Sequence, residues 1–276
     1  MMENMEIPDF FYGTAWKEEA TTGLVTEALT QGFRGIDTAN QRVHYHEVAV
    51  GEGIAEAIHS GITSRDEIFL QTKFTFQRGQ DHRLPYDPEA SIAEQVRQSF
   101  ESSRHHLQTD YLDSYVLHGP STHEGLTGDD WSAWRSMEEI QAAGGTRLLG
   151  VSNVSLNQLK AFCDDAVTAP RFVQNRCFAN RRWDKEIRHF CSANNILYQG
   201  FSLLTANQQY LRHPVILEIC KSRQMSISQT IFRFAIDSGM LPLTGTSKAE
   251  HMKHDLLVKD FKLSETDLEA IENIAF

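Results

Sequence analysis

The chain has 276 residues, of which 41% are hydrophobic and 23% are charged, and its formal net charge at pH 7 is −11. This length suits one domain with a large core, and the composition is typical of a globular protein in water. The negative charge disfavours nucleic acid and anionic membrane surfaces as partners. We therefore expect a single domain over residues 1–276, acting as a monomer.

The sequence shows no signal for secretion and no cysteine pattern typical of a disulfide-bonded or zinc-binding protein. The first ten residues, MMENMEIPDF, lack the basic and apolar regions of a signal peptide, and no apolar run is long enough to span a membrane. Four cysteines stand at uneven spacings without a CxxC pair, which favours reduced thiols over disulfides or zinc ligands. The expected compartment is the cytoplasm.

Short β-like segments alternate with amphipathic helical segments along the whole chain. Strands are expected at residues 10–14, 33–37, 68–73, 112–118, 148–152, 172–174, 197–201 and 241–244. Helices are expected at residues 17–30, 47–59, 88–106, 130–142, 156–165, 185–193, 213–222 and 226–237, with a last helix after Ser264. This alternation implies right-handed βαβ units and favours an α/β fold, a closed (β/α)8 TIM barrel with eight parallel strands. An open, doubly wound sheet is the alternative.

Three consecutive strands end in polar side chains. The apolar run before Asp37 stops abruptly at that acid, the QTKF segment carries Lys73, and the YVLHGP segment carries His118. A barrel brings such strand ends to one rim. A lysine at the end of a buried strand needs a partner, so we expect an ion pair between Lys73 and Asp37.

Tyr45 lies in the loop after Asp37, directly before an expected helix. A tyrosine has a pKa of about 10, and it donates a proton more readily near neutrality when a nearby cation favours the phenolate. Lys73 is expected to supply that field, while His118 is expected to hold the same substrate oxygen. An acid that caps a loop and a tyrosine packed at a helix start are the structural alternatives.

The ordered set of motifs resembles the aldo-keto reductases, a family of barrel enzymes that use NADPH or NADH. The resemblance rests on GFRGIDTA followed by a tyrosine, and on QTKF, YVLHGP, GVSN, VQN and GTSKAEH with a terminal helix. It implies that Asp37, Tyr45, Lys73 and His118 form the catalytic tetrad of the family. It also implies reduction of a small aldehyde or ketone to an alcohol, with hydride transfer from the cofactor and a proton from tyrosine.

The same resemblance implies a nicotinamide cofactor at the barrel mouth. It assigns the carboxamide of the cofactor to Ser152, Asn153 and Gln174, and it assigns the aromatic face under the ring to Phe201, which replaces the usual tyrosine. The other residues of the expected cofactor site are Gly13, Thr14, Ser202, Thr246, Ser247, Lys248, His251 and Asp255.

The phosphate end of this cofactor site departs from the family pattern. His251 stands where members that prefer NADPH carry an arginine. A histidine is neutral for much of the physiological range, so it grips a phosphate less well than a bidentate guanidinium does. Lys248 and Lys253 are the candidate substitutes. We expect NADPH as the cofactor, with NADH used more readily than by the strictest NADPH-dependent members.

Other patterns point to other classes of protein. His44 and His46 resemble the paired histidines of metal-dependent barrel hydrolases, but Tyr45 separates them and Lys73 is not a fitting ligand, so no metal is expected. The GEGIAEAI segment from Gly51 is helical and lacks the third glycine of a dinucleotide loop. A regulatory barrel that binds the cofactor with little turnover stays open as an alternative.

The walls of the substrate pocket are expected to come from the loop after the third strand, with Phe74, Phe76 and Tyr86, and from the loop after His118. Trp16 either lines the same pocket or packs against the end of the barrel. In many members of the family that the sequence resembles, a long C-terminal loop covers the pocket. This sequence stops at Phe276, shortly after the last expected helix, so we expect the pocket to be open on that side.

Overall fold

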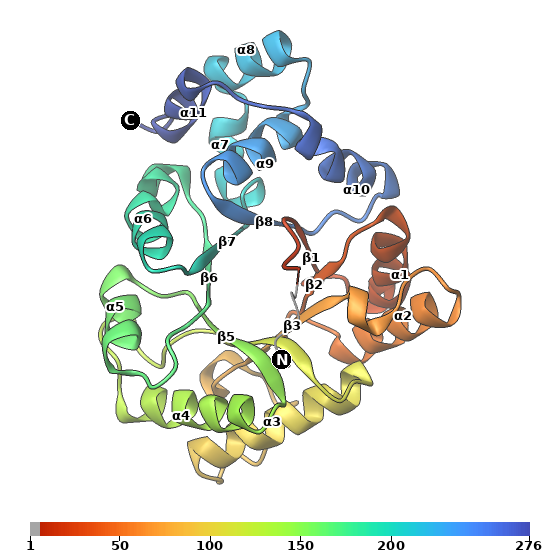
Figure 1. The fold of residues 1–276 in the computed structure, drawn as a ribbon, viewed down its shortest axis with the longest axis vertical. Helices are drawn as coiled ribbons and strands as arrows, with labels where there is room; N and C mark the ends of the chain where they lie inside the picture. Colours follow the sequence, from red (N-terminus) through yellow and green to blue (C-terminus); the bar gives the residue numbers. More distant parts are fainter. Residues whose placement is uncertain (1–5) are drawn as a thin grey trace.

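In the computed structural model, which describes residues 6–276, eight parallel strands close into a barrel in chain order from β1 to β8. Figure 1 shows the strands as a central ring surrounded by helices. The strands are β1 (Phe11–Gly13), β2 (Gly35–Asp37), β3 (Phe69–Phe74), β4 (Leu112–Leu117), β5 (Thr146–Ser152), β6 (Phe172–Arg176), β7 (Leu197–Phe201) and β8 (Met240–Thr244). The closed barrel confirms the expected (β/α)8 fold and excludes the open sheet.

Helices follow the strands and form the outer layer, with α7 to α11 gathered on one side of the ring in Figure 1. They are α1 (Thr21–Gln31), α2 (Glu47–His59), α3 (Ile92–Leu107), α4 (Gly128–Ala142), α5 (Leu156–Asp165), α6 (Lys185–Ala193), α7 (Gln208–Leu211), α8 (Pro214–Arg223), α9 (Ile227–Asp237), α10 (Ala249–Leu256) and α11 (Glu265–Glu272). The sequence did not predict the short helices α7 and α10.

Two helices begin later than the sequence predicts. The start expected at residue 88 is wrong, because the Asp87 carboxylate accepts a hydrogen bond from the backbone of Glu89 in a turn, and α3 is capped by Ser91. The start expected at residue 17 is also wrong. Glu18 has a φ of 44° and opens a 3₁₀ turn, so α1 begins only at Thr21. Local turn geometry therefore sets both boundaries.

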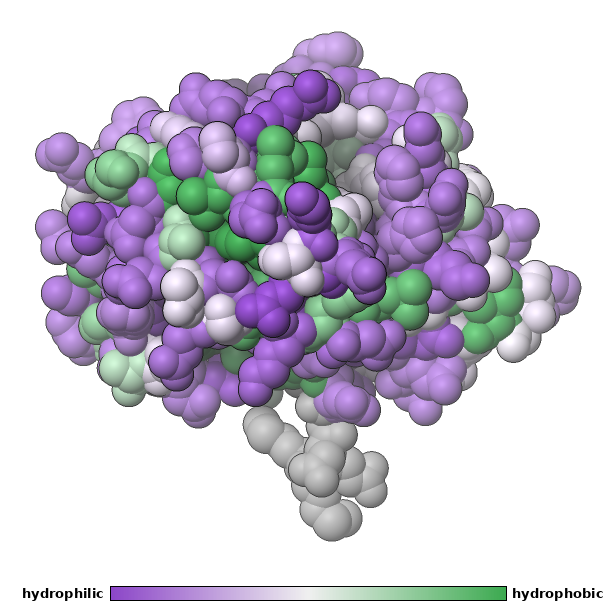
Figure 2. All heavy atoms as spheres, turned by 90° about the horizontal axis from the view of Figure 1, so that it is seen from above, coloured by the Kyte–Doolittle hydropathy of each residue, from purple (hydrophilic) through white to green (hydrophobic). Residues whose placement is uncertain are grey.

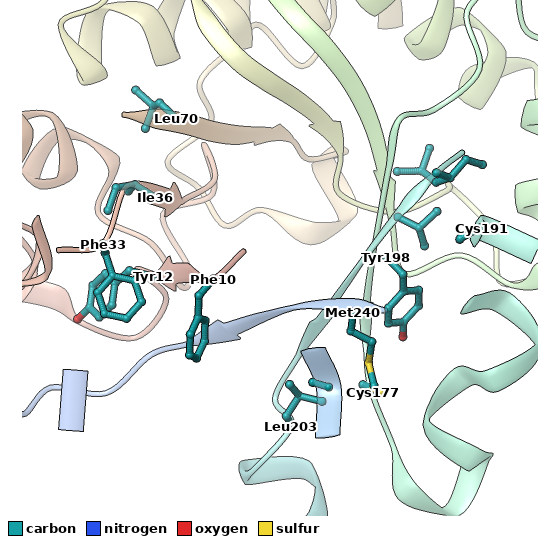
Figure 3. Packing of buried hydrophobic residues seen from close by; sticks show 14 of the residues in the cluster. Phe10, Tyr12, Phe33, Ile36, Leu70, Cys177, Cys191, Tyr198, Leu203 and Met240 are labelled. Atoms are coloured by element: carbon teal, nitrogen blue, oxygen red, sulfur yellow. The ribbon is translucent and has the colours of Figure 1, made fainter. Parts of the chain in front are cut away.

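The strands are mostly buried on both faces, and each contributes apolar side chains to the core. Phe11 points into the barrel, where its ring meets Phe69 edge-on at a centroid distance of 5.5 Å. Its neighbours Phe10 and Tyr12 belong to the outer core and pack around Phe33 at centroid distances of 5.6 and 5.8 Å (Figure 3). Because successive side chains of a strand alternate between faces, each strand feeds both layers.

The molecular surface is mainly hydrophilic in the view of Figure 2, with a connected hydrophobic area near the upper centre and smaller ones elsewhere. Trp16, Val48, Val167 and Leu217 are among the exposed large apolar side chains, and scattered exposures of this kind are normal on globular proteins. Within residues 6–276, no helix is both long and apolar enough to cross a membrane.

Candidate active site

A layer of polar side chains crosses the interior of the barrel. Strand pairing sets Asp37 opposite Gln71 and Gln174 opposite Gln199. Gln71 Nε2 donates to Asp37 Oδ1 at 2.6 Å and to Gln199 Oε1 at 2.9 Å. Gln174 Nε2 donates to the same two oxygens at 2.9 and 3.1 Å. All four side chains are buried, so this network fixes the orientation of the Asp37 carboxylate and of the Gln174 amide.

One layer closer to the mouth, Lys73 forms the ion pair expected from the sequence. Its Nζ donates to Asp37 Oδ1 and Oδ2, both at 2.8 Å, and to the carbonyl oxygen of Thr38 at 2.7 Å. Three acceptors match the three N–H donors of an ammonium group. Burial lowers the pKa of Lys73, but the adjacent carboxylate opposes this shift. The cation is therefore held in place by a full set of partners.

Tyr45 and His118 lie beside this ion pair. Lys73 Nζ is 5.2 Å from the centroid of the Tyr45 ring, and the rings of Tyr45 and His118 are 6.0 Å apart. The loop before α2 positions the tyrosine, because the backbone N–H of Tyr45 donates to the carbonyl oxygen of Gln41 at 3.0 Å. The structure thus brings together all four residues that the sequence placed at one rim.

The pKa of Tyr45 shifts in the direction opposite to the expectation. Burial raises the pKa of Tyr45, and the Asp37 carboxylate raises it further. The expected net lowering of this pKa is wrong for this arrangement, because removal of the phenol from water and the negative charge of Asp37 outweigh the attraction of a phenolate to Lys73. Tyr45 therefore keeps its proton throughout the physiological pH range.

His118 is neutral at physiological pH. Burial lowers its pKa well below the usual value, and the charges of Lys73 and His44 lower it further. Its Nδ1 lies 2.7 Å from the hydroxyl oxygen of Thr75, which leaves Nε2 as the nitrogen available to a substrate. A neutral imidazole can either donate or accept at Nε2, and the choice depends on the tautomer.

The residues expected to hold the nicotinamide carboxamide meet at the ends of β5 and β6. The Ser152 hydroxyl donates to the carbonyl oxygen of Gln174 at 2.6 Å, and Asn153 Nδ2 donates to the carbonyl oxygen of His118 at 2.8 Å. Since the amide nitrogens of Asn153 and Gln174 are already engaged, their amide oxygens are the groups left to accept hydrogen bonds. Such acceptors fit the N–H groups of a carboxamide.

Phe201 and its neighbours form the adjacent part of the mouth. Phe201 is half-buried at the end of β7, and Ser202 after it turns the chain with a φ of 55°. Gly13 ends β1 beside β8, where a Cβ would make an ordinary contact of 3.5 Å with the Thr244 carbonyl oxygen. Thr14 is fully buried and its hydroxyl donates to the carbonyl oxygen of Asp37, so its side chain joins β1 to β2.

The segment between β8 and α10 collects most of the residues expected at the phosphate end. Ser247 and Lys248 are exposed there, His251 is exposed in the first turn of α10, and the Lys248 backbone N–H donates to the Thr246 hydroxyl oxygen at 3.3 Å. The Tyr12 hydroxyl donates to the Thr246 carbonyl oxygen at 2.9 Å and so anchors the segment to the barrel. The exposed donors and cations lie together on one short stretch of chain.

Asp255 is the member of the expected cofactor set that the structure does not bring to this surface. It is 3% exposed, and its Oδ2 accepts a hydrogen bond from the Thr244 hydroxyl at 2.8 Å. Its carboxylate faces β8 beneath α10. Lys17 does reach the segment, since its Nζ donates to the Gly245 carbonyl oxygen. Sequence reasoning missed this lysine because 228 positions separate the two residues.

The aromatic residues expected to wall the pocket are placed elsewhere. Phe74, Phe76 and Tyr86 are buried in the outer core, where the rings of Phe74 and Phe76 are 5.2 Å apart. This expectation is wrong because Lys73 points into the barrel, so Phe74 must point away from it. Trp16 is 70% exposed and its ring contacts His44 at a centroid distance of 4.2 Å with a tilt of 44°, so it does not pack against the barrel end.

Sequence reasoning also missed Gln71, Gln199 and Thr75. Gln71 stands two positions before Lys73, and Gln199 stands two positions before Phe201, so strand alternation places each on the same inner face as its neighbour. That signal was present in the sequence.

No group of three or more His, Cys, Asp or Glu side chains among residues 6–276 is arranged to hold a metal ion.

The comparisons with known proteins all find members of one enzyme family. The model of the aldo/keto reductase family matches residues 12–275. The oxidoreductase YtbE of Bacillus subtilis (strain 168) is 30% identical over 270 residues, which cover 97% of this chain and 89% of the relative. The NADPH-dependent codeinone reductase 1-1 of Papaver somniferum is 30% identical over 267 residues, with coverages of 90% and 78%. A crystal structure of an aldo/keto reductase from Brucella melitensis has a TM-score of 0.82 and 26% identity, with coverages of 97% and 94%.

Proposed function

The chain belongs to the aldo/keto reductase family, and on this premise we propose that it reduces an aldehyde or ketone to an alcohol with NADPH, using Tyr45 as the proton donor. The observation that carries the proposal is the buried constellation at the mouth. A protonated phenol lies beside an ion pair of Lys73 and Asp37 and beside a neutral His118. No other described group combines a transferable proton with these neighbours.

Tyr45 is protonated before the reaction, and its raised pKa does not prevent it from acting as the proton donor. A bound reduced nicotinamide would supply the hydride to the carbonyl carbon. The carbonyl oxygen then develops the charge of an alkoxide, which is a stronger base than a phenolate, so it can take the proton from Tyr45. The phenolate left behind would be stabilised by Lys73, whose Nζ is 5.2 Å from the ring centroid. His118 Nε2 would hold the same oxygen in place.

Several residues support the choice of cofactor. The amide oxygens of Asn153 and Gln174 can accept hydrogen bonds from a carboxamide, and Phe201 offers an aromatic face at the end of β7. Lys248 and His251 are exposed at the start of α10, where an anionic phosphate would find a cation. One relative is named as NADPH-dependent. Because His251 stands in place of an arginine, we propose that NADPH is preferred and that NADH is also accepted.

The test combines nucleotide binding with turnover. NADPH and NADH are titrated separately by fluorescence, and NADPH oxidation is then followed with a panel of aromatic and aliphatic aldehydes and ketones. We expect wild type and Tyr45→Phe to bind NADPH alike, with kcat reduced about 10²- to 10⁴-fold in the variant because general-acid catalysis is lost. Tyr111→Phe is the matched control, since Tyr111 packs against Arg65 and Arg147 outside this constellation.

Three outcomes would contradict the proposal. Absence of nucleotide binding by wild type would exclude the reductase function. Binding without turnover across the whole panel would identify a regulatory barrel instead. Equal turnover by wild type and Tyr45→Phe would assign the proton donor to another group, with His44 and His46 as the next candidates.

A further inference from the structure

Thr75 makes a specific contact with the imidazole of His118. Its hydroxyl oxygen lies 2.7 Å from His118 Nδ1, and Thr75 is 6% exposed. The residue directly follows β3, two positions after Lys73. The neutral imidazole can carry its proton on either nitrogen, so the direction of this hydrogen bond decides what the other nitrogen offers to a substrate.

The surroundings of Thr75 favour one direction. A buried hydroxyl hydrogen needs an acceptor, and within residues 6–276 the only hydrogen-bond partner of the Thr75 hydroxyl is His118 Nδ1. If Nδ1 carried the proton and donated it, the hydroxyl hydrogen would be left without an acceptor. If the hydroxyl donates to Nδ1, both groups are satisfied and the imidazole proton lies on Nε2. The second arrangement leaves no buried donor unpaired.

The loop after β3 fixes the side chain of Thr75 in this orientation. Gly79 makes room for the threonine methyl group, because a Cβ at Gly79 would lie 2.8 Å from Thr75 Cγ2. The Tyr86 hydroxyl donates to the Thr75 carbonyl oxygen at 2.8 Å and anchors the backbone. A β-branched side chain has few allowed rotamers, and in the rotamer adopted here the methyl group lies against Gly79 while the hydroxyl faces His118.

We propose that Thr75 is a positioning residue that selects the Nε2–H tautomer of His118, so that the histidine donates a hydrogen bond to the carbonyl oxygen of the substrate. This inference rests on the proposed reductase function and deepens it. A donor at Nε2 attracts a carbonyl oxygen as negative charge develops on it, whereas a lone pair at Nε2 would repel it. Thr75 thus determines whether His118 attracts or repels the carbonyl oxygen, without touching the substrate itself.

The first measurement is nitrogen NMR of ring-labelled histidine in the full chain with NADPH bound. Pyrrole-type and pyridine-type ring nitrogens resonate apart, and loss of one signal in His118→Gln assigns His118 among the 12 histidines. We expect Nε2 to carry the proton in wild type and in Thr75→Ser, which keeps the hydroxyl. In Thr75→Val, which keeps the shape and loses the hydroxyl, we expect a mixture of both tautomers.

Kinetics provide the second measurement. We expect kcat/KM for the carbonyl substrate to fall about three- to tenfold in Thr75→Val, the range for losing one hydrogen bond, and to stay within about twofold in Thr75→Ser. The KM for NADPH should not change in either variant. A structural role for the threonine methyl group would produce the reverse ranking, with the serine variant more impaired.

Either measurement can overturn the inference. It fails if His118 in wild type carries its proton on Nδ1, or if Thr75→Val keeps the wild-type tautomer and the wild-type kcat/KM. It also fails if Thr75→Ser loses as much activity as Thr75→Val. The NMR result needs no turnover, so a wild-type protein that oxidises no NADPH would refute the proposed function while the tautomer is still read directly.

Discussion

Asp255 is a buried carboxyl group whose charge opposes folding at neutral pH. Burial raises its pKa from 3.8 to about 6, and the hydrogen bond from Thr244 offsets only part of this shift. The unfolded chain releases the Asp255 proton near pH 4, whereas the folded protein holds it until about pH 6, so the destabilisation grows between these values and is constant above them. We predict that Asp255→Asn increases the free energy of unfolding by up to about 3 kcal/mol at pH 8 and leaves it nearly unchanged at pH 4.

Urea unfolding of wild type and variant between pH 4 and pH 8 measures this difference. Asp260→Asn is the matched control, because Asp260 is exposed in the same part of the chain and its substitution removes the same charge. Unfolding curves of wild type and Asp255→Asn that stay separated by the same amount at every pH would contradict the prediction.

The sequence predicted which residues meet at the barrel mouth because a charged or polar side chain at the end of a buried strand is a strong signal. Asp37, Lys73 and His118 each stand at such an end, and the structure brings them together. Contacts between distant segments carry no such signal. Thr75 and His118 are 43 positions apart, and neither residue alone indicates that they touch. The misplaced Phe74 was predictable, since its neighbour Lys73 occupies the inner face.

At the scale of whole elements, glycines in α2 allow three helices to pack closely. A Cβ at Gly51 would lie 2.0 Å from the carbonyl oxygen of His106 in α3, and a Cβ at Gly53 would lie 2.6 Å from the carbonyl oxygen of Thr22 in α1. Backbone atoms cannot move aside as a flexible side chain does. The GEGIAEAI segment therefore carries its glycines for helix packing.

We predict opposite effects for two glycine-to-alanine substitutions in neighbouring helices. Gly51→Ala should lower the free energy of unfolding by about 1–3 kcal/mol, because α2 and α3 must separate to admit the methyl group. Gly23→Ala in α1 should raise it by about 0.5–1 kcal/mol, since a Cβ there meets no atom within 4 Å and alanine favours the helix. Thermal unfolding compares the two variants directly, and midpoints that shift in the same direction would refute this account of the packing.

The sequence predicted the strands and the long helices because apolar residues recur with a different period in a strand than in a helix. It could not predict several turns. Arg182, Trp183 and Asp184 all have φ values between 50° and 54°, a left-handed run that no glycine marks. Tertiary contacts hold this run in place, since Trp183 is buried and its Nε1 donates to the carbonyl oxygen of Ile271 in α11. Such a turn depends on a helix that comes much later in the chain.

At the scale of the whole molecule, contacts with Trp183 and with α6 join the last helix, α11, to the second half of the barrel. Lys185 and Arg188 in α6 both donate hydrogen bonds to Glu272 at the end of α11. Arg188 also donates to the carbonyl oxygen of Trp183 at 2.8 Å and to that of Ser238 at 3.0 Å. One buried guanidinium therefore connects the left-handed turn, the end of α9 and the last helix.

We predict that Glu272→Gln lowers the free energy of unfolding by about 1–3 kcal/mol at pH 7, because Arg188 is buried and loses its carboxylate partner. Burial raises the pKa of Glu272, but the hydrogen bonds from Lys185 and Arg188 and their charges outweigh it, so the pKa is lowered overall. A lowered carboxyl pKa stabilises the folded state above the pKa of the unfolded chain, and the stabilisation is lost as the pH falls through the folded value.

The difference between wild type and Glu272→Gln should therefore shrink toward zero in acid. Urea unfolding at pH 7 and at about pH 3 measures it. Glu269→Gln is the control, because it removes the same negative charge from the exposed face of α11. It distinguishes loss of the Glu272 contact from the general effect of making the net charge of −11 less negative by one. If Glu269→Gln destabilises the protein as much as Glu272→Gln, overall charge and not the contact with α6 governs the stability of the last helix.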